Sequence, residues 1–415
     1  MRFCDAGKFL VSAALIVSWA VFARAGFKPA DVGKSELGKI DYKIVNSAMS
    51  IPLFSASSVW SETPEALSAR LGAKFELTKS QTMTRYSSYV SNRIFGVRAE
   101  QFAFEAQGGK VSEIQIVFFN KGDSIGDGKW TSDDTRKMQI QEKKLSEALS
   151  EIFGKYRNAR LGGGRNSEPA KLWTDGTNDF YLAVKRKEYI MLRILPAGFD
   201  ADSAAKRPRV TMQMDWDKNV EKNANGDVWI KNMPMVNQGG KGYCMPATIE
   251  RCILYYGIND IDMHKIAAAV NTGEGGGTIL SAAIINTRKV VSPYNLRIDM
   301  SQFNFAQIAR NIDRGIPMCW CLFYVPEFRD RLILTTKERQ KGDFKNWISR
   351  SRKMPALKMK SNGFDAGHVC NIVGYNAETQ EIAISNSWGE AHEIEWVRFK
   401  DARAVSMNIF AIRPN

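Results

Sequence analysis

A cysteine near the middle of the chain stands where nucleophilic chemistry would need it. Residues 236–244 read Val-Asn-Gln-Gly-Gly-Lys-Gly-Tyr-Cys, and the three glycines favour an irregular turn before Cys244. Pro246 fits the first turn of a helix, where its missing N–H does no harm. Apolar residues then recur at helical spacing: Ile249, Cys252, Ile253 and Tyr256. Because the dipole at a helix N-terminus lowers the pKa of a thiol, the spacing predicts that Cys244 is a nucleophile.

A cysteine nucleophile needs a proton acceptor, and the chain contains three histidines. His264 lies in a predicted helix over 262–270, and His392 stands among glutamates in a predicted exposed hairpin. We expect neither to take part. His368 follows a glycine and opens the apolar run of residues 369–375. A base at the start of a buried strand is held rigidly, so His368 is the predicted base.

An asparagine that can orient this histidine ends the next predicted strand. Residues 382–389 read Ile-Ala-Ile-Ser-Asn-Ser-Trp-Gly, which places Asn386 at the strand end and Trp388 two residues later. The side-chain carbonyl of an asparagine can accept from an imidazole N–H and so fix the tautomer and orientation of the ring. A tryptophan can cover that hydrogen bond from water and strengthen it.

These three segments resemble the motifs of papain-like cysteine peptidases. The spacing Asn-Gln-Gly-x-x-Gly-x-Cys matches the nucleophile loop of that family. His368 with the later Gly374 and Tyr375 matches its base strand, and residues 386–389 match its Asn-Ser-Trp-Gly motif. The order Cys, His, Asn agrees. His368 and Asn386 follow Cys244 by 124 and 142 residues, where papain-like enzymes have roughly 130–150.

The resemblance implies a catalytic role for four residues. Cys244 would attack a carbonyl carbon as part of an ion pair with His368, and Asn386 would orient the histidine. The side-chain amide of Gln238 and the backbone N–H of Cys244 would form the oxyanion hole.

The resemblance also implies three substrate-binding positions. Gly276 and Gly277 would let an extended peptide approach the backbone closely, with a plain flexible loop as the alternative. Trp388, which would shield the bond between His368 and Asn386, is the third.

Near the nucleophile the chain departs from the family at three positions. Lys241 replaces a cysteine that commonly forms a disulfide, Tyr243 replaces a small residue, and Met245 replaces an aromatic. The N-terminal half also lacks a recognisable helical inhibitory proregion. These differences bear on regulation and on the substrate pocket, and they indicate a distant, bacterial relative.

The predicted function is that of an exported thiol peptidase, which hydrolyses peptide bonds through an acyl-enzyme. One alternative is a catalytically inactive papain-like module that binds without cutting, against which the complete set of catalytic residues argues. Another is a thiol acyltransferase on the same general fold, which an aspartate in place of Asn386 would have favoured. Bacteriocin-processing peptidases are a neighbouring class, usually with aspartate as the third member.

The length of 415 residues predicts more than one domain. Residues 1–25 combine a short basic region, an apolar stretch and an Ala-Arg-Ala site, which predicts a cleaved signal peptide and a secreted or periplasmic protein. An uncleaved N-terminal anchor is the alternative. Residues 26–200 are predicted to form a separate small α+β domain of unknown role, followed by a linker over 201–214. The resemblance implies a papain-like domain over 215–415, with a helical lobe and an antiparallel β lobe.

Within residues 26–200 the patterning predicts two helices and two hairpins. One helix covers 61–72, and the other presents an apolar face of Leu145, Leu149, Ile152 and Phe153. The hairpins pair 97–106 with 111–119 and 179–184 with 189–195.

The composition limits the classes of partner. The formal net charge of +14 is spread over both halves, and nine lysines and arginines lie between 337 and 360. We interpret this run as a solvated loop, or as a surface that favours acidic substrates or an anionic cell envelope. No pattern points to nucleic acid, and no metal or cofactor is expected. The expected partner is a protein or peptide substrate.

The cysteines after Cys244 are interpreted as buried thiols.

Overall fold

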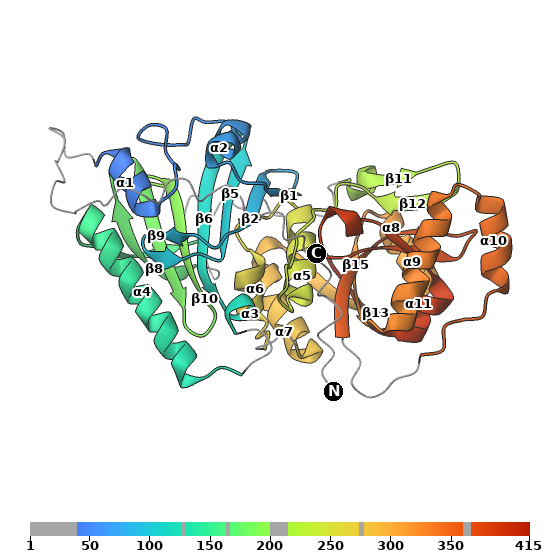
Figure 1. The fold of residues 1–415 in the computed structure, drawn as a ribbon. Helices are drawn as coiled ribbons and strands as arrows, with labels where there is room; N and C mark the ends of the chain where they lie inside the picture. The colour runs from blue at the N-terminus through green and yellow to red at the C-terminus, as the bar shows by residue number, and fades with distance from the viewer. Residues whose placement is uncertain (1–39, 126–128, 163–166, 200–214, 274–277, 360–366) are drawn as a thin grey trace. The chain divides into compact units, whose positions relative to one another are not determined.

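The computed structural model describes residues 40–125, 129–162, 167–199, 215–273, 278–359 and 367–415, which fall into two compact units (Figure 1). The first unit comprises residues 1–78 with 82–206, and the second comprises 79–81 with 207–415. Each unit has its own hydrophobic core. The predicted signal peptide, the predicted linker at 201–214, and Gly276 and Gly277 lie outside the described residues.

The N-terminal unit is built on an eight-stranded sheet, with the strand order β1-β2-β5-β6-β10-β9-β8-β7. Helix α4 (Ser132–Phe153) packs on this sheet (Figure 1), where the Ser150 hydroxyl accepts from Trp173 Nε1 on β8 at 3.1 Å. The strands are β1 (Glu76–Lys79), β2 (Thr84–Tyr89), β5 (Gln101–Gln107), β6 (Lys110–Asn120), β7 (Arg157–Leu161), β8 (Glu168–Thr174), β9 (Asn178–Lys185) and β10 (Tyr189–Pro196). The remaining elements are α1 (Tyr42–Met49), α2 (Pro64–Leu71), α3 (Lys121–Ser124) and the short pair β3 (Arg93–Ile94) and β4 (Val97–Arg98).

Local sequence signals account for most of these elements. Helix α2 begins after Thr63, whose Oγ1 accepts from the Ala66 N–H, and ends at Gly72, which adopts a left-handed φ of 63°. Both predicted hairpins form, β5 with β6 and β9 with β10, and the predicted second helix is α4. The expected strand start at residue 97 is wrong. Residues 97 and 98 pair with β3 instead, and β5 begins at Gln101.

The C-terminal unit combines helices with a second sheet, of order β11-β12-β15-β14-β18-β13, to which β16 and then β17 are added beside β15. Figure 1 shows α5, α6 and α7 on one side of this sheet and α9, α10 and α11 on the other. The α+β class predicted for the chain is confirmed. The strands are β11 (Val220–Lys222), β12 (Asp227–Ile230), β13 (Leu296–Ser301), β14 (Met318–Phe323), β15 (Gly367–Asn376), β16 (Glu381–Ser385), β17 (Glu395–Arg398) and β18 (Ser406–Pro414). The helices are α5 (Cys244–Tyr255), α6 (Met263–Ala269), α7 (Leu280–Val291), α8 (Phe305–Asp313), α9 (Pro326–Gln340), α10 (Phe344–Lys353) and α11 (Phe399–Val405), with 3₁₀ turns η5 (Trp216–Asn219), η6 (Ser292–Tyr294) and η7 (Glu390–His392).

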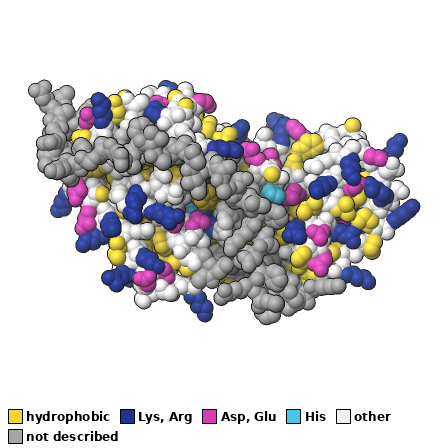
Figure 2. Space-filling view, in the orientation of Figure 1, with side chains coloured by type: hydrophobic (Ala, Val, Ile, Leu, Met, Phe, Trp, Pro, Cys, Tyr) yellow, Lys and Arg dark blue, Asp and Glu magenta, His cyan; other side chains and the backbone are white. Residues whose placement is uncertain are grey.

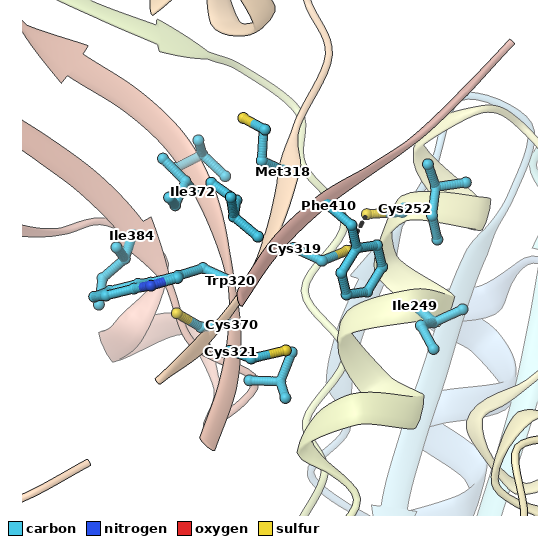
Figure 3. Close-up of a cluster of buried hydrophobic side chains, with 14 of the residues drawn as sticks. Ile249, Cys252, Met318, Cys319, Trp320, Cys321, Cys370, Ile372, Ile384 and Phe410 are labelled. Carbon is cyan, nitrogen blue, oxygen red and sulfur yellow. Dashed lines mark hydrogen bonds between the residues drawn. The ribbon is translucent and has the colours of Figure 1, made fainter. Parts of the chain in front are cut away.

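Helix α5 is buried along its whole length after Cys244. Figure 3 shows its Ile249 and Cys252 beside Cys319 of β14 and Phe410 of β18. Its one arginine, Arg251, is also buried, and its guanidinium donates to the carbonyl oxygens of Pro234 and Ser385 at 2.7 and 3.0 Å. These hydrogen bonds compensate for removing a charge from water. They also fix β16 to α5 one residue before Asn386.

The basic run between 337 and 360 is not the solvated loop that we expected. Most of it belongs to α9 and α10. Arg339 is buried, forms ion pairs with Asp227 and Glu381, and places its guanidinium 3.8 Å from the centroid of the Trp396 ring. It therefore joins α9 to the sheet.

The remaining basic charge does not gather into one patch on the face drawn in Figure 2, where lysines and arginines are scattered among acidic and apolar side chains. Among the described residues, no helix has the length and apolar character needed to cross a bilayer.

Candidate active site

Cys244 is the first residue of α5, as its sequence context predicts. The thiol is half-buried and lies at the backbone of Val369, the residue after His368. One turn further along α5, Thr248 Oγ1 donates to the Val369 carbonyl oxygen at 3.0 Å. Packing of α5 on β15 thus brings the predicted nucleophile and the predicted base together.

His368 is the second residue of β15 and has 7% of its surface exposed. It pairs with Leu322 on β14, so the backbone beside it is held within the sheet. Its Nε2 lies 2.8 Å from Oδ1 of Asn386, the residue that follows β16. An amide oxygen can only accept, so Nε2 carries the proton and Nδ1 has a free lone pair.

Aromatic rings cover this contact. Trp388 stacks on the His368 ring with 4.6 Å between the centroids and 23° between the planes. Tyr324, after β14, meets the rings of both His368 and Trp388 edge-on, at 5.4 and 5.2 Å. Trp388 is thus placed as a shield for the bond between His368 and Asn386. A weakly hydrated hydrogen bond of this kind is stronger than an exposed one.

Gln238 links the loop before Cys244 to the loop after Asn386. Its backbone N–H donates to the Ser387 carbonyl oxygen at 2.9 Å, and its side-chain Nε2 donates to the Lys241 carbonyl oxygen at 3.0 Å. The side chain is buried, and its Oε1 has no hydrogen-bond partner among the described residues. One of the two protons on Nε2 is left for another acceptor.

Asn386 has a second partner that the sequence did not lead us to expect. Its Nδ2 donates to Glu395 Oε2 on β17 at 2.6 Å, and the same Oε2 lies 3.2 Å from His392 Nδ1. His392 thus lies beside the site, and its ring also meets Trp388 edge-on at 5.4 Å. The hydrogen bond and the charge of Glu395 raise the pKa of His392 against the effect of burial.

Burial controls the charge of the site. It raises the pKa of the Cys244 thiol, and hydrogen bonds to the backbone of Val369, Met245 and Cys244 itself lower it by less. Burial also lowers the pKa of His368 to about 4, although Asn386 and Glu395 act in the opposite direction. Both directions favour an uncharged thiol and an uncharged imidazole at neutral pH. The burial of both groups therefore acts against the lowered thiol pKa and the resting ion pair that we expected.

The other cysteines in the described residues are buried free thiols, as we interpreted them: Cys252, Cys319, Cys321 and Cys370. Burial raises the pKa of Cys319, Cys321 and Cys370. None of the described parts of the chain holds a group of three or more potential metal ligands.

The structure thus brings together three residues proposed from the sequence, Cys244, His368 and Asn386, with Trp388 stacked on the His368 ring. Hydrogen bonds join Gln238 to the loops on either side of them. Sequence reasoning missed Glu395 and Tyr324. The sequence signal that could have pointed to Glu395 is an acidic residue at the start of β17, the strand that pairs with β16. Asn386 directly follows β16. For Tyr324 the signal was an aromatic at the end of the strand that pairs with His368.

The chain resembles known proteins mainly in its C-terminal unit. Residues 230–408 match the model of the Peptidase_C39 like family. This match supports a cysteine peptidase-type function for the C-terminal unit and the predicted resemblance to papain-like peptidases. Among solved structures, the chain is similar to xylellain, a cysteine protease from Xylella fastidiosa, with 11% identity and a TM-score of 0.32 over 49% of this chain and 90% of that chain. It is also similar to a cysteine-rich secretory protein from Staphylococcus aureus subsp. aureus Mu50, with 9% identity and a TM-score of 0.20 over 37% of this chain and 48% of that chain. No curated protein matches the sequence at a significant level.

Proposed function

We propose that the C-terminal unit, whose residues 230–408 match a cysteine peptidase family, hydrolyses peptide bonds through an acyl-enzyme on Cys244. The observation that carries the proposal is the 2.8 Å contact between His368 Nε2 and Asn386 Oδ1, buried beside the first turn of α5. A base held in one tautomer next to a thiol is what thiol peptidase chemistry requires.

In the first half-reaction the Cys244 sulfur attacks the carbonyl carbon of the peptide, while its proton passes to Nδ1 of His368. The S–C bond forms and the carbonyl electron pair moves onto oxygen. Because the thiol and the imidazole are uncharged beforehand, His368 acts as a general base during the attack. The imidazolium then gives its proton to the amine nitrogen as the C–N bond breaks.

In the second half-reaction His368 takes a proton from water, which attacks the thioester and releases the carboxylic acid and the thiol. Both tetrahedral intermediates carry a negative oxygen. The free proton on Gln238 Nε2 and the backbone N–H of Cys244 are the proposed donors to that oxygen.

Active-site labelling tests this proposal. The full-length protein should react with iodoacetamide or an epoxide probe at Cys244 and should release soluble peptides from casein. Cys244→Ala should lose both activities and keep the thermal unfolding midpoint. Cys321→Ala, which removes a buried thiol in the same unit, is the matched control and should retain labelling. Equal labelling of the wild type and Cys244→Ala would contradict the assignment of the nucleophile. Labelling without hydrolysis, joined to acyl transfer onto an added amine, would favour a thiol acyltransferase.

We also propose that the protein is exported and meets its substrate outside the cytoplasm. This rests on the residue pattern of 1–25, which predicts cleavage before Gly26. Mass spectrometry of the protein recovered from cell fractions tests it. A mature chain that begins at Gly26 supports export, whereas an intact Met1 in the cytoplasmic fraction opposes it.

A further inference from the structure

Glu395 lies behind the Asn386 side chain, on the side away from His368. It is the first residue of β17 and pairs with Ile384 of β16, two residues before Asn386. The next residue, Trp396, donates its N–H to Thr336 Oγ1 on α9 at 2.9 Å. The Glu395 side chain is buried, and its backbone is fixed by the pairing with β16 and by the bond from Trp396 to α9. The carboxylate therefore has little conformational freedom.

We propose that Glu395 is a positioning residue of the candidate active site, which sets the orientation of the Asn386 amide and, through the amide, the tautomer of His368. The proposal rests on the proposed function, because the tautomer matters to catalysis only if His368 is the base. It adds Glu395 to the four residues that the sequence motifs indicate, which are Gln238, Cys244, His368 and Asn386.

The orientation of the Asn386 amide depends on which of its atoms can donate. An ionised carboxylate can only accept, so the 2.6 Å contact requires that Asn386 present Nδ2 to Glu395. The opposite end of the amide, Oδ1, must then face His368 Nε2, as observed at 2.8 Å. A reversed amide would place Oδ1 against a carboxylate oxygen, and both hydrogen bonds would be lost. Without the carboxylate the two orientations would differ much less in free energy.

The charge of Glu395 has a second effect. When His368 takes the thiol proton it becomes an imidazolium in a buried site, where an unpaired positive charge is costly. The carboxylate lies one amide away from the ring and offsets part of that cost. The same charge acts to raise the pKa of His368 in the resting site, though by less than burial lowers it.

His392 is the other neighbour of the carboxylate, with Nδ1 at 3.2 Å from Oε2. Burial raises the pKa of both Tyr324 and Cys370, and the charge of Glu395 adds to it, so these two groups stay neutral around pH 7. Further ionisable groups lie around the site on several elements among the described residues. They are Cys244 and Arg251 of α5, Cys321 of β14, Tyr324 after β14, Cys370 of β15, Arg329 of α9, and Glu393 after η7.

Nuclear magnetic resonance of histidine tests the proposal without depending on activity. The chain has three histidines, so a full-length protein labelled with ¹⁵N-histidine gives three imidazole patterns, and His368→Gln assigns the one that matters. In the wild type at pH 7, His368 should be the Nε2–H tautomer. In Glu395→Gln, which keeps the shape and removes the charge, a substantial Nδ1–H population should appear, and kcat should fall roughly 10-fold with KM nearly unchanged.

Two further variants separate positioning from a merely structural role. Glu393→Gln removes the same charge from an exposed side chain two residues away, and it should leave the His368 tautomer as in the wild type. In an Asn386→Ala background, Glu395→Gln should cause no additional change in the tautomer, because its effect passes through the amide.

The outcomes discriminate clearly. A pure Nε2–H tautomer of His368 in folded Glu395→Gln would overturn the proposal, as would an undiminished effect of that substitution in the Asn386→Ala background. A tautomer change in a protein whose Cys244 proves unreactive would support the positioning role and refute the peptidase activity instead.

Discussion

The backbone N–H of Gln238 donates to the carbonyl oxygen of Ser387 at 2.9 Å. This bond joins the loop before the nucleophile to the loop that contains Asn386 and Trp388. The proposed oxyanion donor and the residue that orients the base therefore belong to one hydrogen-bonded assembly. Under the proposed function, this bond would hold a substrate carbonyl at Gln238 at a fixed position relative to His368.

Gln238→Ala should lower kcat by about 10²–10³-fold with little change in KM, because the lost hydrogen bond forms mainly with the transition state. Steady-state kinetics on a fluorogenic peptide measures this. Gln238→Glu has the same size but cannot donate from its side chain when ionised, so it should be similarly impaired. Full turnover in either variant would show that another group stabilises the oxyanion.

Asn386→Ala should lower kcat by roughly 10–10³-fold, because the imidazole loses the acceptor that fixes its orientation. The rate should remain above that of Cys244→Ala, which lacks the nucleophile. Wild-type turnover in Asn386→Ala would mean that His368 is oriented by something other than this amide.

Alkylation of Cys244 by iodoacetamide should rise steeply with pH and should still be rising at pH 9. The reason is that burial raises the pKa of the thiol, while His368, with a pKa of about 4, is uncharged at neutral pH and cannot stabilise a thiolate. The measurement is the second-order rate constant between pH 4 and pH 10. A flat, high rate from pH 5 to pH 8 would instead indicate a resting thiolate–imidazolium pair.

The free energy of unfolding should depend on the protonation of His368. In the folded protein its pKa is about 4, below the ordinary 6.5, so the unfolded chain binds this proton first as the pH falls. Stability from this residue is complete above about pH 6.5 and is lost towards pH 4, by at most about 3 kcal/mol. Urea unfolding at pH 7.5 and pH 4.5 should show a smaller decrease for His368→Gln than for the wild type. An equal decrease in both would contradict the depressed pKa.

Gly374→Ala should destabilise the C-terminal unit, whereas Gly367→Ala on the same strand should not. A Cβ at Gly374 would lie 2.7 Å from the Val228 carbonyl oxygen and 2.9 Å from the Trp229 Cβ, and one at Gly367 would meet nothing within 4 Å. Backbone has to move in the first case, which typically costs 1–3 kcal/mol, or roughly a few degrees in the unfolding midpoint. Equal unfolding midpoints for the two variants would show that β12 can move to accommodate the added methyl group at little cost in free energy.

The positions of Cys244, His368 and Asn386 in the fold could be predicted because each lies in a short motif whose local structure the sequence determines. Glycines before Cys244 and Pro246 after it mark a turn and a helix start, and the alternation after His368 marks a buried strand. Glu395 could not be found in this way, because its contact with Asn386 joins two strands of a hairpin. In the sequence it is one of several glutamates around His392, which together are typical of a solvated surface.

Burial was the quantity that sequence patterns misjudged. Arg339 lies in the basic run that we interpreted as a solvated loop, but it is buried and forms ion pairs with Asp227 and Glu381. Burial also bears on the pKa of Cys244, which it raises, and burial depends on strands that are distant in the sequence. Gly276 and Gly277 stay predictions, since they lie outside the described residues.

Because the other cysteines are buried, a thiol titration can measure the fraction of protein molecules whose Cys244 is intact. Cys252, Cys319, Cys321 and Cys370 have at most 4% of their surface exposed, whereas Cys244 is half-buried. Among these five thiols, a colorimetric disulfide reagent should consume one equivalent in the native protein and the other four only in denaturant. The ratio of the two readings would report the fraction of molecules with an intact nucleophile in any preparation, before a substrate is known.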